Sequence, residues 1–205
     1  MRTTDFARLT QRLAALDRNL LLPQDLPLGN YSKAESDAML GYRLLAHAEI
    51  EGYLEALAEN AAQRVLAILR SRPLQQRAEE EIIGHVAKSS YPPRSVQPPP
   101  AKAPSEIIRQ EMSQLVNIIN GNNGVTEKDV LKMFLPLGIP LAWFDATWLR
   151  LMTTFAEARG DIAHNGWANA TTTQLPPSQE RAVVRALLPG LNRLTRRVGG
   201  LTRRL

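Results

Sequence analysis

The sequence predicts an all-α protein, a bundle of five or six helices. Apolar residues recur at spacings of three and four over most of the chain, which is the period of an amphipathic helix. Capping, proline and glycine signals divide this pattern into segments of helical length. No segment rich in valine and isoleucine alternates apolar with polar residues as a half-buried strand would. At 205 residues the chain is long enough to form one domain with its own core.

The N-terminal region, residues 1–30, is predicted to be a helix followed by a linker. Pro23 and Pro27 interrupt the helical pattern and begin the linker. One apolar stripe at helical spacing precedes them, formed by Phe6, Leu9, Leu13, Leu16 and Leu20.

Residues 32–88 form the first helical half. Ser32 and Glu35 stand at capping-box spacing and open the longest periodic segment, which runs to Pro73. A shorter and more polar helix is expected over residues 74–88. The predicted apolar face of the long helix consists of Met39, Leu44, Ala48, Tyr53, Leu57, Val65 and Leu69.

A proline-rich loop, residues 89–104, is predicted to separate the two halves. It carries six prolines in "SSYPPRSVQPPPAKAPS" and therefore cannot form a regular helix or a central strand. Neither half has an obviously complete core, so we interpret residues 1–205 as a single domain with this excursion inside it.

The second half, residues 105–196, is predicted to contain the motif helix. Its first helix ends at "GNNG", and Thr126 and Asp129 then stand at capping spacing for a short helix. A long helix over residues 140–164 follows, and the "HNG" sequence is expected to end it at His164. Its predicted face contains Trp143, Thr147, Leu151 and Phe155.

The last helix and a basic tail, residues 197–205, complete the chain. Pro189 is expected to kink or interrupt that helix. The C-terminal region concentrates positive charge in a chain with a net charge of +5. Such a cluster can bind phosphate or an acidic protein surface, or it can simply complement the negative end of a helix dipole. The arginines concerned are Arg193, Arg196, Arg197, Arg203 and Arg204.

The composition excludes several classes of protein. Without cysteine there is no disulfide, thiolate metal site or cysteine nucleophile, which fits a reducing cytoplasm. The N-terminus has no uninterrupted apolar region of the kind that signal peptides carry, and no apolar run is long enough to span a bilayer. We therefore expect a soluble cytoplasmic protein with no membrane partner.

His47 and Glu51, four residues apart on the long helix, form one candidate for chemistry. The spacing suits a metal pair or an acid/base pair, but it is more often a salt-bridged or partly buried helix face. Walker-type glycine loops and the GxSxG and HExxH motifs are absent from the sequence. We predict neither a metal nor another cofactor, and keep His47 and Glu51 as secondary site residues.

Arg159 and His164 form the main candidate. Histidine exchanges protons near neutral pH, and arginine can bind a phosphate with two parallel hydrogen bonds. Together they suit metal-independent cleavage of RNA, whose 2′-hydroxyl is its own nucleophile. The structural alternative is that His164 caps a helix end and that Arg159 pairs with Glu157 or Asp161.

This motif resembles that of the HEPN superfamily. In "LRLMTTFAEARGDIAHNG" an Arg-x4-His pattern stands at the end of the penultimate long helix and is followed by Asn and Gly. The segment "LLAHAEIEGYLEALAEN" looks like the first core helix of those proteins. "NGNNGVTEKDVLKMFLPLGIP" is similar to the segment before the motif helix in the RiboL-PSP-associated, MAE-type prokaryotic branch. The resemblance covers roughly residues 32–194.

The resemblance implies a metal-independent endoribonuclease that acts as a toxin in a toxin–antitoxin pair or as an abortive-infection, phage-defence effector. Its site would form across a homodimer, with Arg159 stabilising the transition-state charge and His164 acting as acid/base. Asp161 would support the site and Asn165 would hold the substrate. Other implied partners are RNA, weakly contacted by Arg193, Arg196 and Arg197, and an antitoxin or other operon-encoded protein.

The sequence departs from the family at Gly160, where a polar residue usually follows the arginine, and His-x-Tyr is absent because Gly166 stands two residues after His164. Two alternatives therefore stay open. One is a non-catalytic HEPN module that dimerises and binds RNA or a protein. The other is a helical adaptor outside the family that uses the proline-rich loop and the basic tail.

Overall fold

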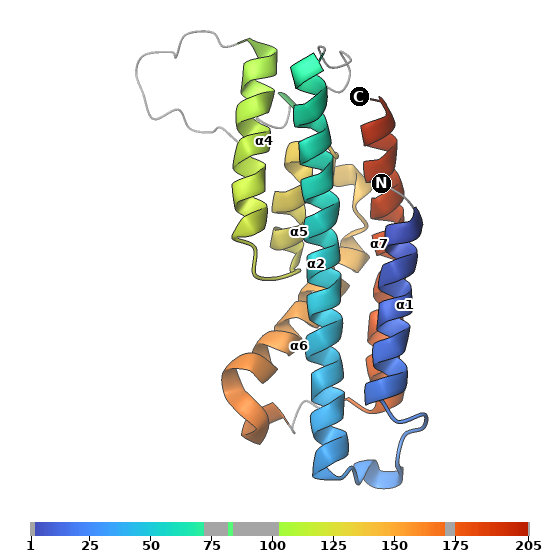
Figure 1. Cartoon of the computed structure of the whole chain (residues 1–205). Helices are drawn as coiled ribbons and strands as arrows, with labels where there is room; N and C mark the ends of the chain where they lie inside the picture. The colour runs from blue at the N-terminus through green and yellow to red at the C-terminus, as the bar shows by residue number, and fades with distance from the viewer. Residues whose placement is uncertain (1–2, 72–81, 84–102, 171–174, 205) are drawn as a thin grey trace.

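The computed structural model shows an all-helical chain (Figure 1). It describes residues 3–71, 82–83, 103–170 and 175–204, and over residues 3–4, 28, 71, 161–170 and 201–204 it describes the backbone only. These residues form six α-helices and three short 3₁₀-helices, and no strand occurs among them. The predicted all-α class is confirmed. Residues 89–102 of the predicted proline-rich loop lie outside the described residues.

Helices α1 (Thr3–Leu20) and α2 (Lys33–Ser71) form an antiparallel pair, joined through η1 (Pro27–Gly29). The predicted stripe of α1 is confirmed, because Leu9, Leu13 and Leu16 are buried and Phe6 and Leu20 pack against the same core. The predicted capping box of α2 is also present. The Ser32 amide donates to Glu35 Oε2 at 2.7 Å, and the Glu35 amide donates to Ser32 Oγ at 3.3 Å.

Helix α2 is the central element, and it contacts α1, α4, α5, α6 and α7. Because neighbours surround it, its buried residues lie on several sides and do not form one stripe. Within the predicted face, Met39, Leu57 and Val65 are buried, but Ala48 is exposed, so the prediction was wrong at Ala48. The buried residues of α2 include Tyr42, Ala46, Ile50, Leu54, Ala58, Ala61 and Ala62.

Helices α4 (Pro104–Asn120) and α5 (Glu127–Phe134) cover a second side of α2. The predicted capping box of α5 is present, with Thr126 and Asp129 bonded reciprocally. The turn η2 (Leu135–Leu137) ends at Gly138, whose φ of 79° favours glycine. Of the polar helix predicted over 74–88, only Ile82 and Ile83 are described; both are helical, and Ile82 is buried in the core.

Helix α6 (Ala146–Ala170) begins and ends later than predicted. Asp145 Oδ1 accepts hydrogen bonds from the amides of Thr147 at 2.8 Å and Trp148 at 3.1 Å, which fixes the start after η3 (Leu141–Trp143). The buried face also differs from the predicted one. Leu151 is 41% exposed, and only Phe155 of the predicted face is buried within the helix. The core side of α6 consists of Trp148, Leu149, Met152, Phe155 and Ala156.

Helix α7 (Pro177–Arg204) packs against α1, α2 and α6. The Ser178 amide near its N-terminus donates to Asp25 Oδ1 at 2.9 Å. The helix continues through Pro189, so Pro189 does not interrupt it, and the kink that was the other expected outcome stays a prediction. Residues 197–204, which we assigned to a tail, form its last turns.

Trp148 and Gly190 lie at the contact between α6 and α7. The indole Nε1 of Trp148 donates to the Leu187 carbonyl at 3.0 Å, and a Cβ on Gly190 would lie 2.2 Å from that nitrogen. We therefore expect Gly190→Ala to lower the free energy of unfolding by about 1–3 kcal/mol. Gly199→Ala is the matched control on the same helix, because a Cβ there meets nothing within 4 Å. Urea unfolding would contradict this expectation if both variants were equally stable.

Candidate functional site

His47 lies in the interior between α2 and α6. Its residue is 1% exposed, and its ring stacks on Phe155 with a centroid distance of 5.6 Å and an interplanar angle of 25°. Burial, followed by the positive charge of Arg159, lowers the pKa of His47 to about 4. The imidazole is therefore neutral near physiological pH.

Glu51 lies one turn after His47 on the same helix. Its Oε2 is 3.6 Å from His47 Nδ1, which is too long for a hydrogen bond. Burial and the neighbouring Glu55 raise the pKa of Glu51. Among the described atoms, neither His47 Nδ1 nor Glu51 Oε1 has a hydrogen-bond partner. Buried polar atoms without partners are rare in folded proteins and often belong to functional sites.

Arg159 adds a positive charge beside His47 and Glu51, and these three residues form the His47–Arg159 cluster. It is half-buried on α6, one turn after Phe155; its charge helps to lower the pKa of His47 and opposes the rise in the pKa of Glu51. No ion pair joins Arg159 to a side chain in the described part of the chain, including Glu157, the first of the two pairing partners considered above. The structure thus brings together two candidates, Arg159 and the His47–Glu51 pair, that the sequence presented separately.

His164 occupies a different position on α6 from the one predicted. We expected the helix to end at His164, but it continues to Ala170, so that expectation was wrong. An Asn-Gly pair costs only about 1–2 kcal/mol in helix propensity, and the following "WANA" contains two alanines. On a continuous helix the positions of Arg159 and His164 are about 140° apart. The side chains of Asp161, His164 and Asn165 lie outside the described residues.

Helix α5 contacts both α2 and α6, the helices that carry this cluster. The Glu127 amide donates to Thr153 Oγ1 at 2.9 Å, which joins the start of α5 to α6. Asp129 forms an ion pair with Lys132 at 3.0 Å, and its charge opposes the lowering of the His47 pKa. The sequence pattern indicates Asp129 only as a capping residue, and it does not indicate the stacking role of Phe155.

The basic residues of α7 lie elsewhere. Arg193 is 3.6 Å from Asp145, and the Arg197 guanidinium lies 5.4 Å from the Trp143 ring centroid, whereas Arg196 is exposed. These contacts are at the N-terminal end of α6, about four helical turns from Arg159. The predicted RNA-binding arginines therefore lie in a different part of the structure from the His47–Arg159 cluster.

The predictions also concern metal binding and membrane association. No group of three or more His, Cys, Asp or Glu side chains in the described residues is arranged to hold a metal ion. None of the helices, searched over the same residues, combines the length and apolar character needed to cross a membrane.

The fold and the cluster define a class: an all-α bundle with a buried histidine–glutamate pair beside a half-buried arginine. Comparison of the chain with family models, curated proteins and solved structures finds no match. The HEPN-like assignment therefore stays a prediction from the motif.

Proposed function

We propose that the chain is a metal-independent endoribonuclease whose site is composed from two copies in a homodimer. The observation that supports this function is the half-buried Arg159, which lies near a neutral histidine and has no ion pair among the described side chains. A guanidinium in such surroundings can bind a phosphodiester with two hydrogen bonds and stabilise the charge that develops on it.

In the proposed reaction the RNA supplies its own nucleophile. The 2′-oxygen forms a bond to phosphorus, the bond from phosphorus to O5′ breaks, and the products carry a 2′,3′-cyclic phosphate and a 5′-hydroxyl. One proton leaves the 2′-hydroxyl and one is delivered to O5′, which needs a base and an acid. His164 performs one of these transfers, while Asp161 and Asn165 support and orient the substrate. No metal-activated water is required for this chemistry.

The helix geometry supports a composite site. Because the positions of Arg159 and His164 are about 140° apart on a continuous α6, one copy does not present them on a single face. A two-fold dimer that places the C-terminal parts of two α6 helices side by side would bring an arginine from one copy toward a histidine of the other. It would also supply the two proton-transfer groups that the reaction needs.

His47 and Glu51 act as positioning residues in this proposal. His47 is too deeply buried to touch RNA, but a neutral imidazole beside Arg159 adds no second positive charge to the cluster. We place the enzyme in the cytoplasm as a toxin or phage-defence effector, with an operon-encoded inhibitor as its partner. These roles rest on the resemblance of the motif alone.

The test is RNA cleavage by the purified chain in excess EDTA. We expect Arg159→Ala and His164→Ala each to reduce the rate at least about a hundredfold. Arg109→Ala, an exposed arginine on α4 outside the predicted RNA-binding set, is the matched control and should retain most activity. The wild-type product should carry a 2′,3′-cyclic phosphate.

Two outcomes would overturn the nuclease proposal. One is cleavage that persists unchanged in both variants. The other is RNA binding without cleavage by the wild-type chain, which would favour the non-catalytic RNA- or protein-binding module; Gly160, in place of a polar residue, is the feature that favours this alternative.

A further inference from the structure

One face of α2 is exposed and apolar over several turns. Every exposed residue of α2 between Asp37 and Glu59 is apolar, namely Leu45, Ala48, Gly52 and Ala56. Leu45 is 43% exposed. The solvent side of a surface helix normally carries polar residues, so this face has the composition of a helix contact.

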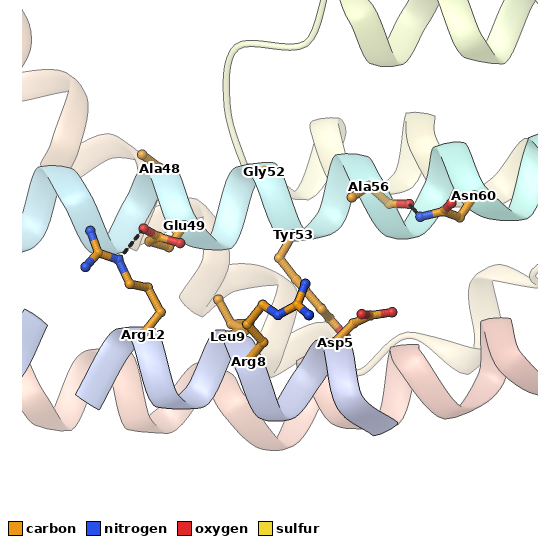
Figure 2. A pocket seen from close by; sticks show the side chains of 10 residues that line it. All are labelled: Asp5, Arg8, Leu9, Arg12, Ala48, Glu49, Gly52, Tyr53, Ala56 and Asn60. Carbon is orange, nitrogen blue, oxygen red and sulfur yellow. Dashed lines mark hydrogen bonds and ion pairs between the residues drawn. The ribbon is translucent and has the colours of Figure 1, made fainter. Parts of the chain in front are cut away.

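A groove runs beside this face. A cavity of about 550 Å³ lies between α1 and α2, with Ala48, Gly52 and Ala56 among its α2 lining (Figure 2). On the α1 side Arg12 reaches across to Glu49, with Nε 2.8 Å from Oε1. A Cβ on Gly52 would meet nothing within 4 Å, so the floor is open to an incoming side chain.

The face has a symmetric pattern of residue sizes about Leu45. Ala34 and Ala56 stand eleven residues before and after it, and Ala38 and Gly52 stand seven before and after. Gly41 precedes Leu45 by four residues, and Ala48 follows it by three. An antiparallel pair of identical helices with a two-fold axis at Leu45 would therefore place small residues opposite small residues. An isologous interface requires this self-complementarity.

We propose that two copies of the chain associate through this face of α2, antiparallel, with the two-fold axis at Leu45. Ala38 then lies opposite Gly52 of the partner subunit, and the small residues let the two backbones approach closely. The face from Ala34 to Ala56 is about 33 Å long, and the α1 wall of the groove adds area toward the ~800 Å² per copy of a standard interface. The exposed residues of α2 between Asp37 and Glu59 carry no charge, which matters because each copy has a net charge of +5. The charged residues of the groove, Asp5, Arg8, Arg12 and Glu49, would form a rim beside them.

This interface is distinct from the one required by the proposed nuclease. His47 follows Leu45 by two residues and is therefore about 200° around α2 from it. Pairing through Leu45 thus leaves the His47–Arg159 cluster uncovered. The interface does not rest on the proposed function.

The absence of cysteine makes a direct test simple. Leu45→Cys places the new side chains of two copies at the axis, where a disulfide can form if the Cα atoms lie within about 7 Å. Under mild oxidation we expect efficient formation of a covalent dimer. Ile118→Cys on α4 is the matched control, because Ile118 is 39% exposed but lies off this face, and we expect at least about tenfold less crosslinking.

Two further measurements fix the orientation and separate the two proposals. A mixture of Ala38→Cys and Gly52→Cys chains should crosslink to each other more than either crosslinks to itself.

Leu45→Glu should weaken self-association at least about tenfold in sedimentation without loss of helix, since Leu45 is exposed. RNA cleavage that survives Leu45→Glu but is lost in His164→Ala would show that the two interfaces are independent. A monomeric wild-type chain, or a dimer in which Leu45→Cys crosslinks no better than Ile118→Cys, would overturn the α2 interface.

Discussion

Glu180→Ala is expected to lower the free energy of unfolding by about 3–5 kcal/mol. Glu180 on α7 accepts hydrogen bonds from Arg43 on α2, with Nε 3.2 Å from Oε2 and a second bond from the other guanidinium nitrogen. Both side chains are only 4% exposed. Removing the carboxylate would leave the Arg43 charge buried without its partner, and that desolvation cost is the reason for the large effect.

Two controls separate this cause from a general loss of packing. The double variant Arg43→Met, Glu180→Leu removes both charges, and we expect it to recover most of the lost stability. The ion pair between Arg12 and Glu49 also joins two helices, but its side chains are 50% and 33% exposed, so Glu49→Ala should cost less than about 1 kcal/mol. Chemical unfolding that gave Glu49→Ala and Glu180→Ala the same loss would contradict the explanation.

The sequence predicts those features of the fold that depend on residues close together in the chain. The capping boxes at Ser32–Glu35 and Thr126–Asp129 depend on residues three apart, and both are present. The stripe of α1 was predicted because α1 contacts the bundle on one side. Periodicity failed on α2, because a helix surrounded by neighbours buries residues on several sides, and it could not indicate that Ala48 is exposed.

The candidate site was predictable only in part. Arg159, His47 and Glu51 were each identified, but their convergence depends on the packing of α2 against α6, which no sequence spacing encodes. The stop expected at His164 was wrong because a weak local breaker does not end a helix whose following residues favour it. Because α6 continues past His164, Arg159 and His164 are not neighbours at a helix end. Their positions lie on different faces of α6.

The burial of His47 predicts a pH dependence of stability. The pKa of His47 is about 4 in the folded chain and about 6.5 when the chain is unfolded. Between these values the unfolded chain binds a proton that the folded chain does not, so stability falls as the pH decreases from about 6.5 to about 4. The full loss from this residue would be about 3 kcal/mol.

The measurement compares urea unfolding of the wild-type chain and His47→Leu from pH 8 to pH 4. We expect the wild-type chain to lose stability relative to the variant over this window. Glu51 acts in the opposite sense, because its raised pKa favours the folded state below that pKa and this contribution is lost as the pH rises through it. Repeating the comparison in a Glu51→Gln background separates the two groups. A difference between wild type and His47→Leu that does not change with pH in either background would show that His47 is not held neutral beside Arg159, and the electrostatic basis of the cluster would then fail.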